Sequence, residues 1–157
     1  MKGKVFVLIC LSFCLIGLIG YGMISNKFSQ AVTQQTLKET NQSMSNEING
    51  LILTVNHVRT EPSEKADTHF VIVDLTIENT RESVYEFSMF KLTLVDEENY
   101  AYNYSSNIET KGILSGQIHP ESIKRGEVAF EVPIGTNYTF VYTDHLRTGQ
   151  VTWDIKL

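Results

Sequence analysis

The stretch FVIVDLTI, residues 70–77, carries the strongest secondary-structure signal in the chain. Every second position holds a large aliphatic residue, and the four are Val71, Val73, Leu75 and Ile77. A period of two is typical of a β-strand, in which alternate side chains point to the same face. Apolar residues also occur on the opposite face, so we expect this strand to lie at the centre of a sheet.

Shorter runs of the same kind lie on both sides of this strand. They cover residues 51–55, 84–87, 90–95, 100–104, 127–132, 138–142 and 150–155. Turn residues separate them, notably Glu61-Pro62-Ser63, the acidic residues 96–99 and Lys124-Arg125-Gly126. We expect Phe90, Leu92 and Leu94 to face the core, and residues 105–120 to cross between sheets. This pattern over residues 50–157 predicts an all-β fold, an immunoglobulin-like antiparallel β-sandwich of about seven strands.

A different pattern marks the N-terminus. Residues 5–24 are apolar and uncharged, and their number is close to the ~20 that span a bilayer as a helix. Lys2 and Lys4 precede them, and the positive-inside bias would hold this end in the cytoplasm. We therefore expect one N-terminal hydrophobic helix within residues 1–24, a signal anchor or signal peptide that places the C-terminal domain outside the cell membrane.

The mode of attachment has two alternatives. A single-pass anchor is one, and secretion after cleavage near Ala31 is the other, because Ser29 and Ala31 are small residues at the spacing that signal peptidase reads. Cys10 and Cys14 follow bulky residues inside the apolar segment, which argues against lipidation. Residues 25–49 are mostly polar and predict a linker, so the expected domains are 1–24, 25–49 and 50–157.

Charge limits the choice of partner. After residue 31 the chain has 10 Lys and Arg against 18 Asp and Glu, a formal charge of −8. Nucleic acid and anionic lipid headgroups are poor partners for such a surface, whereas cations and basic partners suit it. No cysteine follows residue 14, so the exported part has no disulfide to form.

Residues that could carry catalysis are scarce. Ser88-Met89-Phe90-Lys91 matches the S-x-x-K of penicillin-recognising serine enzymes, but that chemistry needs a helix and the motif here leads into a strand. The acidic residues 96–99 lack the alternating ligands and glycine of a calcium loop. No spacing pairs two histidines for zinc among His57, His69, His119 and His145. We expect no catalytic residue, no cofactor and no metal, and a protein that is not an enzyme.

Three tyrosines are the candidate binding residues. Tyr100, Tyr102 and Tyr104 alternate along one predicted strand, so they would share a face and could present it to a protein or glycan. The alternative is that this face belongs to the core. Trp153, between Val151 and Ile155, is expected in the core.

Several motifs resemble a known family. They are FVIVDLTIEN at residues 70–79, FKL at 90–92 and RGEVAFEVP at 125–133. The chain resembles a small bacterial cell-surface domain of unknown function that is often attached to lipoproteins, is sometimes misnamed a telomeric repeat-binding factor, and is related in fold to the mycobacterial immunoprotective extracellular antigen. The resemblance implies an immunoglobulin-like fold outside the membrane, with no established activity.

The sequence favours an extracytoplasmic binding module, held to the membrane by its N-terminal helix or secreted, with an envelope protein or glycan as partner. Two alternatives remain open. One is a small envelope hydrolase that uses carboxylates such as Asp74 and Glu131, and the other is a purely structural spacer in the envelope.

Overall fold

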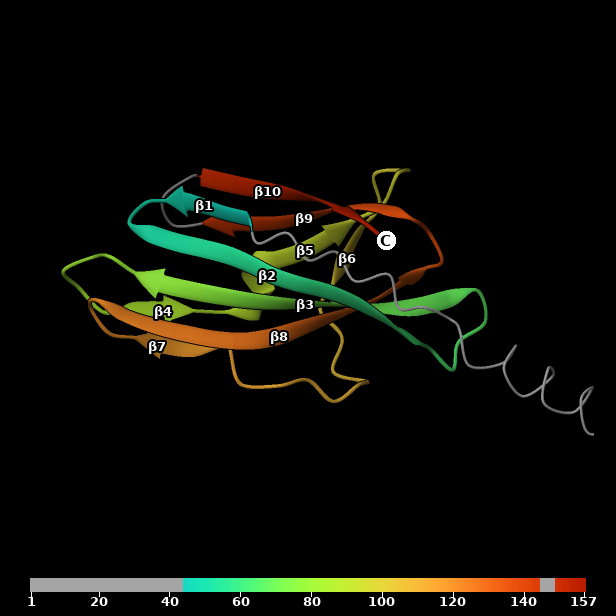
Figure 1. The fold of residues 1–157 in the computed structure, drawn as a ribbon, viewed down its shortest axis with the longest axis horizontal. Helices are drawn as coiled ribbons and strands as arrows, with labels where there is room; N and C mark the ends of the chain where they lie inside the picture. The colour runs from blue at the N-terminus through green and yellow to red at the C-terminus, as the bar shows by residue number, and fades with distance from the viewer. Residues whose placement is uncertain (1–43, 145–148) are drawn as a thin grey trace, which may run out of the picture. The chain divides into compact units, whose positions relative to one another are not determined.

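The computed structural model describes residues 44–144 and 149–157, which form two antiparallel sheets packed face to face (Figure 1). The first sheet has the order β1-β2-β3-β8, with bounds Met44–Ile48, Leu51–Pro62, Thr68–Asn79 and Ser122–Pro133. The second has the order β10-β9-β5-β6, with bounds Gly149–Lys156, Asn137–Asp144, Leu92–Val95 and Ala101–Asn103. A ribbon of β4 (Tyr85–Phe87) and β7 (Gly116–Ile118) and the 3-10 turn η1 (Met89–Lys91) are the other described elements. The predicted all-β antiparallel sandwich is confirmed.

β3 lies at the centre of the first sheet, as its sequence predicts. It pairs with β2 on one side and with β8 on the other. Its aliphatic face is fully buried at Val71, Val73, Leu75 and Ile77. The opposite face is also partly covered, because Ile108 packs on a small cluster that includes Phe70 and Ile72.

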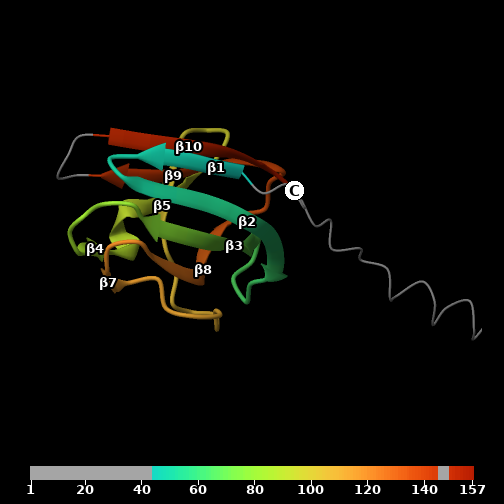
Figure 2. The same ribbon diagram turned by 60° about the vertical axis from the view of Figure 1, so that its left-hand side comes forward.

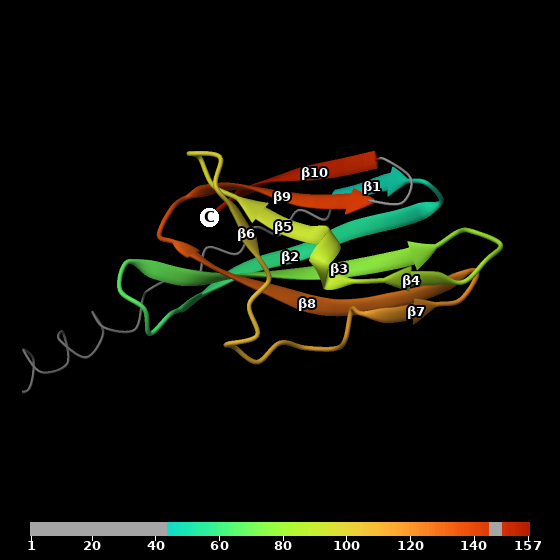
Figure 3. The same cartoon turned by 180° about the vertical axis from the view of Figure 1, so that it is seen from behind.

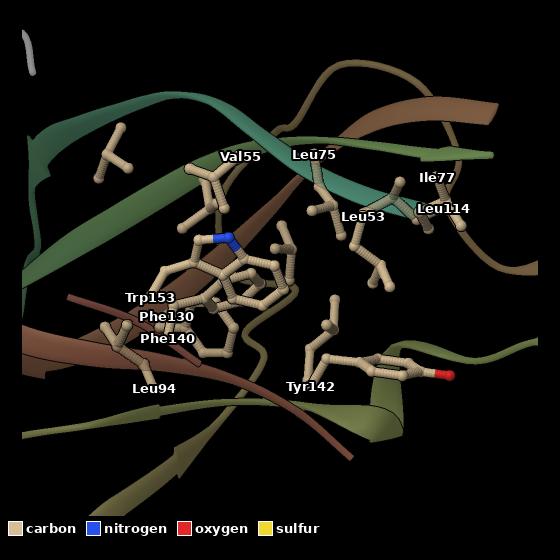
Figure 4. Close-up of a cluster of buried hydrophobic side chains, with 14 of the residues drawn as sticks. Leu53, Val55, Leu75, Ile77, Leu94, Leu114, Phe130, Phe140, Tyr142 and Trp153 are labelled. Atoms are coloured by element: carbon tan, nitrogen blue, oxygen red, sulfur yellow. The ribbon is translucent and has the colours of Figure 1, made fainter. Parts of the chain in front are cut away.

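The core lies between the two sheets, where their inner side chains meet (Figure 4). Phe130 of β8 lies edge-on to Phe140 of β9, with 5.9 Å between ring centroids. Phe140 in turn lies 5.4 Å from the ring of Trp153 on β10. Trp153 is 3% exposed, which confirms its place in the core. Each such buried side chain contributes roughly 1.5–3 kcal/mol through removal of apolar area from water.

The structure has more strands than the sequence pattern predicts, ten among the described residues instead of about seven. One of them, β1, falls inside the segment 25–49 that reads as a polar linker. β1 pairs with β2 through the tight turn at Asn49 and Gly50, where both residues have positive φ. Alternation in MSNEI is weak because only Met44 and Ile48 pack on the core, so a short edge strand resembles a linker in sequence.

The predicted turn at Lys124-Arg125-Gly126 is wrong, because these residues lie within the continuous strand β8. Gly126 pairs with Leu75 of β3 and forms a bridge with Gly112 on its other side. A Cβ at Gly112 would lie 2.8 Å from the carbonyl oxygen of Arg125. Glycine therefore allows a close backbone approach here, and the same residue type is easily mistaken for a turn signal.

Phe90 also departs from its predicted place. It lies in η1 and is 73% exposed, whereas Leu92 and Leu94 face the core as expected. The 3-10 turn begins at Ser88, whose hydroxyl accepts a hydrogen bond from the Phe90 amide, and this local turn interrupts the period of two.

Two contacts tie β1 to the last strand, although the two belong to different sheets (Figure 2). The indole N–H of Trp153 donates to the Met44 carbonyl at 3.1 Å. The amide of Asn46 donates to the Thr152 carbonyl, also at 3.1 Å. The first and last described strands therefore close one side of the sandwich.

The connection that follows β6 runs alongside the free edge of β8 (Figure 3). The Ser105 amide donates to the Ala129 carbonyl at 2.7 Å, and the Glu127 amide donates to the Lys111 carbonyl at 2.7 Å. The prediction of a long connection over residues 105–120 holds except for β7, which occupies part of it and pairs with β4.

Several predictions concern residues outside the described part of the chain. These are the hydrophobic helix within residues 1–24 with its two cysteines, the cleavage site near Ala31, the first part of the linker, and His145. Within residues 44–144 and 149–157, no helix has the length and hydropathy of a membrane span.

Candidate functional site

A pocket lies at one end of the sandwich, where the connections 63–67, 96–100 and 134–136 come together. The Ile134 amide donates to the Asp67 carbonyl at 3.1 Å, and the Leu157 amide donates to the Thr136 carbonyl at 2.8 Å, so these connections and the last described residue support one another. The pocket has a volume of about 330 Å³. Its lining, which defines what we call the tyrosine pocket, includes Asp96, Glu97, Glu98, Tyr100, Tyr102 and Tyr138.

Asp96 organises the acidic turn through its own carboxylate. One oxygen accepts hydrogen bonds from the amides of Glu98 and Tyr100, both at 2.9 Å, and the other accepts the Tyr102 hydroxyl at 2.8 Å. Desolvation raises the pKa of Asp96, but the hydrogen bonds from Tyr100, Tyr102 and Glu98 outweigh it and lower this pKa overall. The bond from Tyr102 also raises the pKa of that phenol. The turn is thus a preformed wall of the pocket.

The three predicted tyrosines do not share one surface. Tyr100 and Tyr102 both line the tyrosine pocket, Tyr100 with 62% of its surface exposed and Tyr102 packed partly on the core. Tyr104 lies elsewhere, against Phe90, with 5.3 Å between ring centroids. Only Tyr102 lies within β6, since the strand ends at Asn103, so the alternation that would align all three is too short.

Tyr138 is a pocket residue for which the sequence pattern predicts only a place in a strand. Its hydroxyl donates to the Pro133 carbonyl at 2.6 Å and lies 2.8 Å from Nε2 of His69. Because the phenol proton goes to Pro133, the imidazole N–H is the donor in the second bond. Burial raises the pKa of Tyr138 to about 12 and lowers the pKa of His69. Tyr138 therefore acts as a neutral, fixed floor of the pocket.

The charged residues that line the tyrosine pocket are all acidic. Its lining, all within the described residues, contains the three carboxylates of Asp96, Glu97 and Glu98 and no Lys or Arg. The Asn137 amide donates to Glu97, which orients that carboxylate, and Glu98 is exposed. Aromatic faces beside carboxylates attract cations through both the ring quadrupole and the charge.

A second polar cluster lies at the opposite end of the sandwich, where β9 ends. Asp144 is 1% exposed there and accepts a hydrogen bond from Asn49 at 3.2 Å. Arg81 lies 3.5 Å from one carboxylate oxygen and Lys91 lies 3.9 Å from the other. We call these four residues the Asp144 cluster. It joins the β1–β2 turn, the β3–β4 connection, η1 and β9 through charges that are nearly buried.

The lysine of the S-x-x-K motif, Lys91, belongs to this cluster. Lys91 donates to the Tyr85 hydroxyl at 2.5 Å, and its ammonium lies over the ring of the same tyrosine at 4.6 Å. The Tyr85 hydroxyl also meets that of Tyr142 at 2.6 Å, and burial raises the pKa of Tyr142 above its ordinary value. Ser88 uses its hydroxyl to cap η1. Lysine and serine thus have separate structural partners.

The carboxylates named for a hydrolase do not face each other in the register of the sheet. Asp74 lies opposite Glu127, whereas Glu131 lies opposite Phe70 and accepts the Ser63 hydroxyl at 2.5 Å. The hydrogen bond from Arg125 outweighs desolvation and lowers the pKa of Asp74, which leaves this group without the proton that a general acid needs. In the part of the chain that the structure describes, no three His, Cys, Asp or Glu side chains are placed to hold a metal ion.

Fold and site together define a small all-β sandwich with a polar pocket at one end. A family model described as a domain of unknown function, DUF4352, matches residues 28–152, and the chain belongs to that family. No curated protein shows significant similarity to the chain.

Several solved structures of bacterial proteins are similar in fold to this chain. The ycdA protein of Bacillus subtilis, described as a candidate lipoprotein, is 16% identical with a TM-score of 0.63, over 73% of this chain and 39% of that one. The yjhA protein of Bacillus subtilis is 17% identical with a TM-score of 0.55, over 73% and 96%. An uncharacterised β-sandwich protein of Clostridium difficile is 11% identical with a TM-score of 0.51, over 72% and 90%. At these identities the likeness concerns the fold.

Proposed function

We propose that the chain is an extracytoplasmic binding module that takes cationic groups of a partner into the tyrosine pocket. The observation that carries the proposal is a pocket of about 330 Å³ whose lining joins three tyrosines to three carboxylates. Cavities of this size suit a side chain or a small ligand. The negative charge of the pocket has the same sign as the formal charge of −8 carried by the residues after position 31.

The location outside the membrane is part of the same proposal. It is supported by the uncharged segment at residues 5–24 behind Lys2 and Lys4, and by the likeness in fold to a candidate lipoprotein. The segment would hold the domain at the membrane, and cleavage near Ala31 would instead release it.

The sandwich is of the immunoglobulin type in this proposal, in agreement with the resemblance to the mycobacterial immunoprotective antigens. What supports it is strand order, because β2-β3-β8 and β10-β9-β5 correspond to strands A-B-E and G-F-C of that fold. Tyr138, near the start of β9, donates to a carbonyl five residues upstream, as the tyrosine corner of such domains does.

Binding of labelled pentapeptides to the full chain in a nonionic detergent tests the proposal. Pentalysine and pentaarginine should bind saturably, and pentaglutamate and pentaserine should not. Tyr100→Ala should weaken binding about tenfold, since it removes an exposed aromatic contact worth more than ~1 kcal/mol at a binding hot spot.

Matched variants separate the pocket from general electrostatics. Phe90→Ala removes another exposed aromatic outside the pocket and should leave binding unchanged. Glu98→Gln should weaken binding, while Glu121→Gln, an exposed acid outside the pocket, should not. Equal losses in the pocket and control variants would mean diffuse charge attraction and would reject the proposed site.

A further inference from the structure

The outer face of the first sheet carries a second cavity, of about 560 Å³, that shares no lining residue with the tyrosine pocket. The side chains that line it belong to β2, β3, β8 and the connection after β6. They define what we call the arginine groove and are His57, Arg59, Asp74, Lys111, Arg125 and Glu127.

The backbone gathers these residues in two ways. A bulge between Val55 and His57 shifts the register of β2 against β3, and beyond it His57, Asp74 and Glu127 lie in one cross-strand row. The bridge between Gly112 and Gly126 holds the β6–β7 connection against β8, so that Lys111 becomes one wall of the groove.

The two acids of the groove already accept hydrogen bonds from other residues of the protein. Asp74 accepts the Arg125 guanidinium on both oxygens, at 2.9 and 2.6 Å, and also the Asn56 amide at 3.1 Å. Glu127 is 8% exposed and accepts Arg59 and the backbone amide of Lys111, both at 3.0 Å. These carboxylates orient cations instead of facing a ligand.

Two of the cations, Lys111 and Arg125, face the solvent, and the Arg125 side chain is 62% exposed. The Arg59 side chain is 22% exposed and pairs with Glu61 through one terminal nitrogen and with Glu127 through the other. Two guanidinium groups, fixed by carboxylates behind them, have N–H donors left over, and the geometry of such donors matches an oxyanion. The lining of the groove thus has three formal positive charges against two negative ones, and Glu61, outside the lining, adds a third acid beside Arg59.

We propose that the arginine groove binds an oxyanion group, phosphate or carboxylate, borne by a small solute or an envelope polymer. The ligand would lie between Arg59, Lys111 and Arg125, with the two acids holding the guanidinium groups behind it. The net charge of the domain argues against large polyanions such as nucleic acid but not against one such group in a preformed groove.

Calorimetric titration of the full chain in a nonionic detergent tests this, with inorganic phosphate, glycerol 3-phosphate and acetate as probes at constant ionic strength. We expect saturable binding of at least one probe. Lys111→Gln removes an exposed ammonium that belongs to neither the Arg59–Glu127 nor the Arg125–Asp74 ion pair, and it should weaken binding about fivefold. Arg125→Gln should weaken binding at least tenfold.

Lys65→Gln is the matched control, because it makes the same charge change at an exposed lysine outside the groove, and it should bind as the parent does. Tighter binding of glycerol 3-phosphate than of inorganic phosphate would point to a polymer or headgroup source, and the reverse to free phosphate. Absence of saturable binding with all three probes, or an equal loss in Lys65→Gln, would overturn the proposal.

Discussion

Asp144 and Asp96 lie at opposite ends of the sandwich, and different kinds of partner satisfy their two carboxylates. Asp144 is buried where β9 ends, and the charges of Arg81 and Lys91 balance it. Asp96 follows β5 at the other end, where two backbone amides and the Tyr102 hydroxyl satisfy it without a cation. The first arrangement uses charge to join segments, and the second leaves the neighbouring acids available to a partner.

This difference predicts that substitutions at one end of the sandwich affect stability and substitutions at the other end affect binding. Substitutions in the Asp144 cluster should act on stability, because breaking a buried ion pair leaves an uncompensated charge out of water. Substitutions of the exposed residues of the tyrosine pocket, such as Tyr100 and Glu98, should act mainly on binding, because surface groups seldom change stability by more than about 0.5 kcal/mol. Three measurements of stability examine the contrast.

The largest effect is expected for Asp144→Asn. The change keeps the shape of the side chain but leaves Arg81 and Lys91 without their acid, so we expect the free energy of unfolding to fall by about 3–5 kcal/mol. Urea unfolding followed by the fluorescence of Trp153 measures it. Asp154→Asn on the exposed face of β10 is the control and should change stability little; a similar loss in both would erase the contrast.

A smaller effect is expected for Tyr138→Phe, at the pocket end. The substitution removes the hydrogen bond to the Pro133 carbonyl and the contact with His69, and we expect a loss of about 1–2 kcal/mol in the free energy of unfolding. Tyr100→Phe, in an exposed position, is the matched control and should leave stability within about 0.5 kcal/mol. A loss above that of Asp144→Asn would reverse the ranking of the two ends.

The smallest effect concerns pH and His69. Burial lowers the pKa of His69 below its ordinary value of 6.5, so between the two values the unfolded chain binds more protons than the folded one. Stability should therefore be full above about pH 6.5 and decline as the pH falls through the folded pKa. The pKa values of Asp74 and Asp96 are also lowered, but these groups affect stability only at lower pH, below 3.8. Thermal unfolding from pH 7.5 to 5 should show the decline in the parent and a flatter profile in His69→Gln.

The fold was largely predictable because the strongest strand is a long alternating run. β3 and the inner residues of β8, β9 and β10 bury large apolar side chains every second position, and that periodicity is visible without a structure. Short edge elements were not predictable in the same way. β1 buries too little to show a pattern, and Gly126 reads as a turn although it serves a close approach between two backbones.

The candidate site was predictable only in part. Tyr100 and Tyr102 stand out as neighbours in sequence, and they do meet beside the acidic turn. Tyr138 joins them from a strand 36 residues further along, and only topology brings β5, β6 and β9 together. The Asp144 cluster and the arginine groove are likewise assembled from distant segments, and single charged residues in a sequence carry no sign of such partners.

The contacts at the sides of the sandwich have a consequence for association between copies of the chain. An uncovered strand edge is a template on which another chain can add a strand, and many such additions lead to aggregates. Here side chains of Asn46 and Trp153 bond across between β1 and β10, and residues 105, 111 and 112 bond to part of β8, so these stretches of edge are covered. A strand from a second copy would have to displace these contacts before it could pair with the covered stretches.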